Sequence, residues 1–160
     1  MSTTRTTADA CTLLDNDHKA VKKMFKAYEE LTQSKARGTE KKKLELAQQI
    51  CQELTVHAQI EEEIFYPALR EALSETDLLA EAEVEHASAK DLIAQIEAMD
   101  TADEMFDAKV TVLGEYIDHH VKEERNEIFP KARAARKLDL VAMRDELQAR
   151  KDALMGVEVA

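Results

Sequence analysis

The chain has 160 residues and a formal net charge of -11. This length fits one domain with a core of its own. The negative charge repels phosphate backbones and anionic lipid headgroups, so we expect neither nucleic acid nor a membrane as a partner. No stretch approaches the roughly 20 apolar residues of a membrane helix, and residues 1–7 lack the apolar core of a secretory signal, which predicts a cytoplasmic protein.

Four long segments carry apolar residues at helical spacing, and short polar breaks separate them. Only three glycines and two prolines interrupt a chain that is rich in helix-forming residues. The predicted helices lie at about 8–31, 40–73, 79–96 and 104–135, and residues 74–77 resemble a cap before the third. Short connections make neighbouring helices antiparallel. The fold class predicted is all-α, an antiparallel up-down-up-down four-helix bundle.

The bundle is predicted to occupy residues 8–136, after a flexible N-terminus at 1–7. A weaker apolar pattern at 138–154 predicts a short fifth helix within a C-terminal segment at 137–160. This helix either packs across an end or side of the bundle or mediates self-association. We expect a monomer or a weak homodimer.

Both prolines stand inside helical patterns, where a proline removes a backbone hydrogen bond and bends the helix. Each ends the same motif, in which a histidine precedes a glutamate by four residues and the proline by ten: His57, Glu61 and Pro67, then His120, Glu124 and Pro130. A further histidine precedes each motif, His18 in the first helix and His86 in the third. The chain therefore reads as two similar helical hairpins with approximate two-fold symmetry.

The histidines and glutamates of these motifs interrupt the apolar faces of their helices, because residues four apart share one face. A single histidine on an apolar face is more often a hydrogen-bonded core residue than a ligand. A buried ionised carboxylate, however, needs a compensating charge, and the same faces offer no Arg or Lys. The six residues together predict a metal site: His18, His57, Glu61, His86, His120 and Glu124. The spacing alone leaves zinc and manganese open beside iron.

This set of motifs resembles the bacterial hemerythrin-like (HHE cation-binding) domain family, over about residues 13–134. The resemblance implies a four-helix bundle with two non-haem iron ions bridged by both carboxylates. His18 and His57 would then bind one iron, and His86 and His120 the other. Two ferric ions carry more positive charge than two carboxylates cancel, so we also expect an oxo or hydroxo bridge.

One position departs from the oxygen-carrying hemerythrins of invertebrates, which have a second histidine one turn from the first on the third helix. Here Ala82 and Lys90 stand at those offsets from His86. The centre is therefore one imidazole short, which leaves coordination positions for a small ligand such as oxygen, nitric oxide or peroxide.

Two function classes stay open from the sequence. One is a module that binds a diatomic ligand as a store, carrier or sensor, or that senses or stores iron. The other is a di-iron enzyme that turns over peroxide or nitric oxide in oxidative or nitrosative stress, which the open positions favour. Repair of iron–sulphur clusters is less favoured. Relatives with that role carry a cysteine-bearing N-terminal segment, whereas the first dozen residues of this chain contain only one cysteine, Cys11. A metal-free structural bundle ranks last.

Residues around the six carry smaller expectations. His119 lies about 100° round the helix from His120 and is expected beside the site or on the surface, with a role as a metal ligand as the less favoured alternative. Tyr116, one turn before His120, is expected to be a core tyrosine, and Cys51 a buried thiol. Five apolar residues are expected to wall the site, and three further glutamates to be solvated: Phe25, Leu54, Phe65, Leu113 and Ile117, then Glu62, Glu63 and Glu123.

Overall fold

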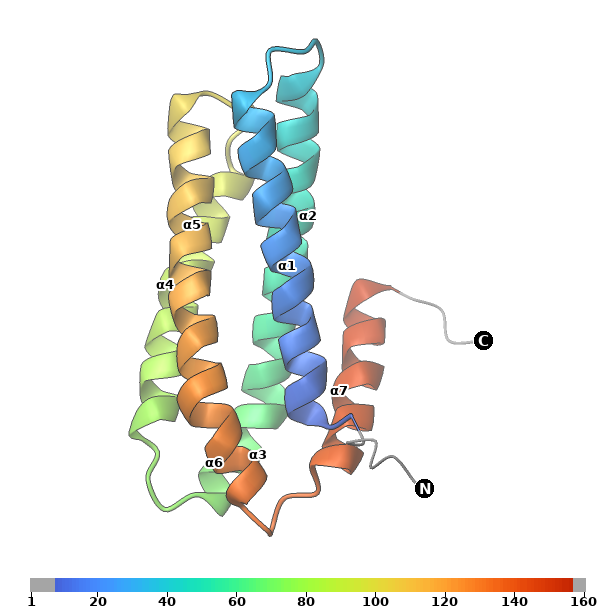
Figure 1. The fold of residues 1–160 in the computed structure, drawn as a ribbon, viewed down its shortest axis with the longest axis vertical. Coiled ribbons are helices and arrows are strands. Elements are labelled where there is room, and N and C mark those ends of the chain that lie inside the picture. The colour runs from blue at the N-terminus through green and yellow to red at the C-terminus, as the bar shows by residue number, and fades with distance from the viewer. Residues whose placement is uncertain (1–7, 157–160) are drawn as a thin grey trace, which may run out of the picture.

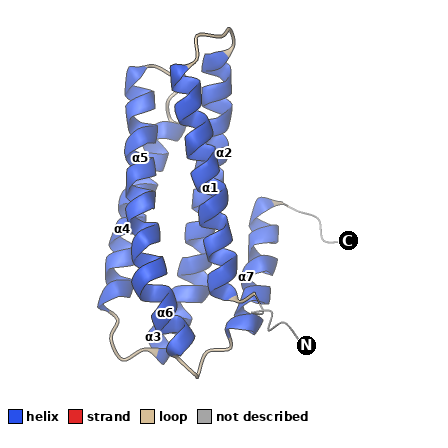
Figure 2. Cartoon of the chain, in the orientation of Figure 1, coloured by secondary structure: helices blue, strands red, loops and turns tan. Residues whose placement is uncertain are grey.

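The computed structural model describes residues 8–156, and these residues form helices and connections without any strand. The helical elements form four long rods, and the shorter helix at the C-terminal end lies against one side of them (Figures 1 and 2). The all-α four-helix bundle is therefore confirmed. Nowhere within residues 8–156 is a helix long and apolar enough to cross a membrane.

Each rod follows the chain order that the sequence predicts, and two of the rods contain a short π-helical turn. The first rod is α1 (Ala10–Gln33), and the second consists of α2 (Thr39–Ile60), η1 (Glu61–Phe65) and α3 (Tyr66–Ala72). The third is α4 (Asp77–Glu97), and the fourth consists of α5 (Glu104–Glu123), η2 (Glu124–Ile128) and α6 (Phe129–Ala134). The last helix is α7 (Leu140–Met155). Contacts of α1 with α2 and α5, and of α4 with the same two helices, close the four rods into a ring.

Aspartates begin three of the helices. The side chains of Asp9, Asp103 and Asp139 accept hydrogen bonds from backbone N–H groups in the first turns of α1, α5 and α7. Such bonds satisfy donors that have no partner inside the helix. The cap expected at residues 74–77 is different, because Thr76 precedes α4 but its side chain makes no capping hydrogen bond.

The two internal prolines follow π-helical turns, where the sequence predicted only bends. The N–H of Tyr66 donates to the carbonyl of Glu61, and that of Phe129 to the carbonyl of Glu124, five residues back in each case. Pro67 and Pro130 come next and have no N–H to donate. A π turn takes up one residue more than an α turn, so each rod continues past its proline.

Two apolar clusters fill the bundle, one toward each end. The first contains Leu14 and Ile60, and the second contains Val21 and Leu54. His18 lies between Leu14 and Val21 in the chain, and the other site residues interrupt their rods in the same way. The metal-ligand candidates therefore occupy the layer between the two clusters.

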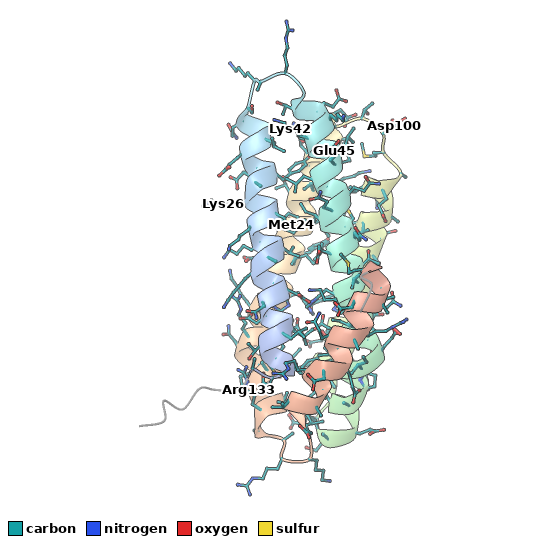
Figure 3. The ribbon with its side chains drawn as sticks, turned by 90° about the vertical axis from the view of Figure 1, so that its right-hand side faces the viewer. Met24, Lys26, Lys42, Glu45, Asp100 and Arg133 are labelled. Atoms are coloured by element: carbon teal, nitrogen blue, oxygen red, sulfur yellow. The ribbon has the colours of Figure 1, made fainter. Side chains whose placement is uncertain are left out.

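The C-terminal helix α7 packs along the side of the bundle. Packing of this helix on the bundle is one of the two alternatives expected from the sequence. The helix contacts α1, α2 and η1. Met143 and Leu147 are buried in the same cluster as Leu14. Figure 3 faces this side and shows α7 in front of one half of the bundle, while Lys26, Lys42 and Glu45 mark the other half of α1 and α2.

Candidate metal centre

The six residues predicted as metal ligands come together in one buried layer. The four histidines reach it from α1, α2, α4 and α5, and the two glutamates open the π turns η1 and η2. Each histidine is at most 7% exposed, and both glutamates are 0% exposed. All four rods thus contribute to the same site, as the hairpin repeat predicts.

The donor atoms form two groups, and within each group they lie within 4.8 Å of one another. One group holds His18, His57 and Glu124, and the other holds Glu61, His86 and His120. The Nε2 atoms of His18 and His57 are 3.1 Å apart, and those of His86 and His120 are 3.2 Å apart. The structure therefore pairs the histidines as the family resemblance implies.

Each glutamate lies between the two groups. Glu61 Oε1 is 3.1 Å from His57 Nε2 and 3.3 Å from His86 Nε2. Glu124 Oε1 is 3.1 Å from both His18 Nε2 and His120 Nε2. A carboxylate in this position is placed to bridge two ions.

Among the described residues, three of these buried carboxylate oxygens have no hydrogen-bond partner: Glu61 Oε1 and Oε2, and Glu124 Oε1. The histidine nitrogens are close to them but do not meet them in hydrogen-bonding geometry. Leaving a charged oxygen unpaired in a protein core is costly. Carboxylate oxygens and imidazole Nε2 atoms that converge in this way fit a pair of transition-metal ions.

A carboxylate lies at the second ring nitrogen of every one of these histidines. The Nδ1–carboxylate distances are 3.4 Å to Asp15 for His18, 3.0 Å to Asp17 for His57, 3.2 Å to Glu62 for His86 and 3.2 Å to Glu85 for His120. A proton on Nδ1 directed at a carboxylate leaves Nε2 free to bind a metal. The four acidic side chains thus orient the four imidazoles toward the centre.

Each of the orienting carboxylates also meets a basic side chain. Arg125 donates to Asp15, Lys151 to Asp17 and Lys90 to Glu62, and His119 lies 3.8 Å from Glu85. Lys90, one turn after His86, thus supports that histidine through Glu62.

Two of the histidines have strongly raised pKa values in the metal-free site. Burial alone would lower the pKa of His57, but the charge of Glu61 and the hydrogen bond to Asp17 raise it to about 10. Burial likewise opposes protonation of His120, while Glu124 and Glu85 raise its pKa to about 11. Burial would raise the pKa of Glu61, but the charge on His57 holds it well below its usual range. The metal-free site therefore keeps protons on His57 and His120 and negative charge on Glu61.

Tyr66 is a residue of the centre that sequence reasoning missed. Its buried hydroxyl donates to Glu124 Oε2 at 3.2 Å and lies 3.3 Å from His120 Nε2 and 3.5 Å from His86 Nε2. Burial and the two glutamate charges raise its pKa well above the usual range, so the hydroxyl stays protonated. The signal available in the sequence was its place before Pro67, matched in the other half of the repeat by Phe129.

Phe129 makes the two halves of the centre chemically different. Its ring stacks on that of His18, with centroids 6.1 Å apart, whereas Tyr66 lies beside His86 at 5.4 Å. The approximate symmetry therefore places a hydroxyl beside His86 in one donor group and an apolar ring beside His18 in the other.

A cavity of about 260 Å³ opens beside the histidines. All four imidazoles line it, but neither Glu61 nor Glu124 does. Most of its other lining is aliphatic, as with Leu54 and Ile117, two of the residues expected as walls. The histidines thus separate a largely apolar cavity from Glu61 and Glu124.

The remaining expected wall residues lie elsewhere. Phe25 and Leu113 belong to the apolar cluster that contains Val21, and Phe65 packs against the rings of Tyr66 and Phe129. Gly114 explains the position of Phe25, since a Cβ there would come within 3.2 Å of that ring.

Several smaller expectations are corrected or confirmed. Tyr116 is 50% exposed at the cavity and is not a core residue. Glu62 is only half solvated because it orients His86, while Glu63 pairs with Arg150 at the surface. Glu123 is also half-buried, 3.1 Å from the exposed ring of His119.

The expectation for the cysteine thiols holds. Cys51 is buried, as predicted, and so is Cys11. Burial raises the pKa of each thiol to about 12. Neither side chain belongs to either donor group of the centre.

Comparison with known proteins agrees with this geometry. The model of the hemerythrin HHE cation-binding domain matches residues 9–132. The fold resembles the crystal structure of a hemerythrin HHE cation-binding domain-containing protein from Mycobacterium kansasii, with a TM-score of 0.75 and 22% identity, over 92% of this chain and 88% of that one.

A curated protein of Nostoc sp. named DNA nickase is 35% identical over 81 residues, which are 51% of this chain but only 23% of that protein. The chain thus spans less than a quarter of this relative's length. The family match, in contrast, includes all six candidate ligands and most of the chain. The protein belongs to the hemerythrin HHE cation-binding domain family.

Proposed function

We propose that this protein binds two iron ions in the buried layer and holds a small ligand, such as oxygen, nitric oxide or peroxide, beside them. The observation that carries the proposal is the convergence of four Nε2 atoms on buried carboxylate oxygens that have no hydrogen-bond partner. His18 and His57 would hold one ion, and His86 and His120 the other. Glu61 and Glu124 would bridge the two ions.

Bound iron would supply redox chemistry and coordination positions that the protein does not fill. The residues themselves supply orientation and shelter from water. The Nδ1 partners hold each imidazole with Nε2 facing the centre, and the apolar clusters on both sides limit the access of solvent.

The cavity supports the assignment of a small ligand. It reaches the four imidazoles on a side that neither Glu61 nor Glu124 lines, and its aliphatic lining suits uncharged molecules such as oxygen and nitric oxide. A ligand that enters there approaches the ions without displacing Glu61 or Glu124.

Turnover of peroxide or nitric oxide by the same centre is a second candidate, which Tyr66 favours. Its protonated hydroxyl lies within hydrogen-bonding distance of Glu124 and beside two imidazoles. A proton donor in this position can serve a bound ligand that gains electrons. A Tyr66→Phe variant that keeps its iron but loses turnover would distinguish this candidate from simple binding.

The experiment that tests the proposal is anaerobic loading with Fe(II), followed by elemental analysis and optical titration with azide after oxidation. We expect two iron ions per chain and new visible absorption on adding azide. Binding of no more than trace iron, or a loaded centre that no small ligand perturbs, would contradict it.

Two alanines of α4 offer a test site and a control site for the role of the cavity in ligand binding. Ala89 lines the cavity, and Ala94 is exposed on the same helix. Ala89→Leu should keep the iron but weaken azide binding, because the added side chain fills the approach to the ions. Ala94→Leu should leave both unchanged.

A further inference from the structure

The C-terminal helix reaches the metal centre through two hydrogen bonds in series. Lys151 of α7 donates to Asp17 Oδ1 at 2.6 Å, and Asp17 Oδ2 lies 3.0 Å from His57 Nδ1. Asp17 is buried, and the side chain of Lys151 is three-quarters buried above it. Residue 151 lies beyond the segment that the family model matches, which ends at residue 132.

His57 differs in this respect from the other three histidines of the centre. The basic residues that contact the orienting carboxylates of those three histidines all belong to the four rods. They are Arg125 in η2, Lys90 in α4 and His119 in α5. Of the four orienting carboxylates, only Asp17, which contacts His57, is bound by a residue of α7, a helix outside the four rods. The ion position formed by His18, His57 and Glu124 therefore has a support that the other position lacks.

The attachment of α7 combines apolar and charged contacts. Met143 and Leu147 are buried against the bundle, Arg150 pairs with Glu63, and Arg144 donates to the carbonyl of Ala8. A single helix held in this way can open locally without unfolding the four rods. Opening would remove Lys151 from Asp17 and leave that carboxylate without its cation.

We propose that Lys151 positions His57 for metal binding, and that docking of α7 and occupation of the His18–His57 position stabilise each other. The inference rests on the proposed metal function. With Lys151 in place, Asp17 is fixed with Oδ2 facing His57 Nδ1, which directs His57 Nε2 toward the centre. Loss of a carboxylate that orients a metal-binding histidine lowers metal affinity by about 10–100-fold, and Lys151 acts through such a carboxylate, so its loss should cost about 10-fold, the lower end of this range.

Coupling between two binding events is reciprocal, so iron must stabilise docked α7 by the same factor by which docked α7 favours iron. Amide hydrogen exchange in Leu140–Met155 should therefore slow by about 10-fold when Fe(II) is bound. This measurement needs no substitution and has a readout other than activity.

The matched pair of variants is Lys151→Met and Arg150→Met. Both remove a cation of α7 that pairs with the bundle, but only Lys151 is linked to a candidate ligand. In an anaerobic Fe(II) titration, Lys151→Met should weaken one of the two iron positions by about 10-fold and leave the other near wild type. Arg150→Met should keep both affinities, even though it loosens α7.

Hydrogen exchange completes the test. In Arg150→Met, Fe(II) should still slow exchange in α7 by the wild-type factor, whereas in Lys151→Met it should have little effect. Equal iron affinities in the two variants, or α7 exchange that Fe(II) does not alter in the wild type, would overturn the coupling while leaving the metal function intact. Failure of the wild type to bind iron would overturn both.

Discussion

Binding of iron should displace protons from the centre. In the metal-free protein His57 has a pKa of about 10 and His120 a pKa of about 11, so both are protonated at pH 7. An imidazole must give up the proton on Nε2 before it binds a metal. His57 and His120 belong to different donor groups, so each ion position should release about one proton from these residues as it fills.

The size of the effect follows from this count. Between about pH 6 and pH 8, where both groups stay protonated without metal, the apparent affinity of each position should rise about tenfold per pH unit, or about 1.4 kcal/mol. The raised pKa values stabilise the metal-free fold below the free imidazole pKa of about 6.5, and this contribution is lost as pH rises through 10 to 11. The difference in Tm between the loaded and metal-free proteins should therefore widen as pH rises.

Two measurements check this prediction. Anaerobic calorimetric titration with Fe(II) in two buffers of different ionisation enthalpy counts the protons released, and repeating it at several pH values gives the slope. A mutant control is Ala94→Leu, which should leave the proton count unchanged because Ala94 is exposed on α4 and belongs to neither donor group of the centre. Affinity that stays flat from pH 6 to pH 8, with no proton release, would refute the assignment of His57 and His120 as ligands.

Three further outcomes are expected. His120→Ala should lose much of the iron while His119→Ala keeps it, by elemental analysis, because the ring of His119 is 69% exposed and turned to Glu123; the reverse result would mean that the inner face of α5 is wrongly assigned. Tyr66→Phe leaves an oxygen of Glu124 without its donor and should lower metal-free stability by about 1–3 kcal/mol in urea unfolding, and an unchanged midpoint would show that this hydrogen bond is not formed. Asp9→Ala removes the cap of α1 and should cost about 1 kcal/mol in the same assay, whereas no loss would mean that water replaces the cap.

Helical periodicity predicted the six candidate ligands because they lie where the rods are regular. His57 and Glu61 stand on one face of α2, up to the first residue of the π turn, and His120 and Glu124 do the same in the fourth rod. Spacing by four residues therefore holds for both pairs. Because apolar residues precede and follow these positions on the same helix faces, the sequence also predicted that the six side chains are buried.

Tyr66 escaped prediction because it follows the π turn. Five residues in an α-helix amount to a rotation of about 140°, which directs the residue after Phe65 away from Glu61. The π turn changes this rotation and brings the hydroxyl of Tyr66 into the centre. Sequence periodicity alone carries no sign of such a turn except the proline that follows.

The orienting carboxylates escaped prediction for another reason. Asp17 and Glu62 each serve a histidine on a different helix, so their role depends on how the helices are placed next to each other. The pattern of a single helix marks them only as acidic residues near the edge of an apolar face. The opposite error occurred at Tyr116. Its place near the edge of an apolar face suggested a buried residue, but the side chain is half exposed.

The π turns also determine where a rod can absorb a change in chain length. Deleting one of residues 62–64 would turn the second rod into an uninterrupted α-helix, in which Tyr66 and Leu69 follow Glu61 by four and seven positions and so stay on its face. Deleting one residue elsewhere in the rod would instead rotate everything on one side of the deletion by about 100° about the rod axis. Residues 34–38, between α1 and α2, have no such register to preserve. Among relatives that keep this centre, a length change within a rod should therefore fall in the five-residue turn, and other insertions and deletions should fall in the connections between rods.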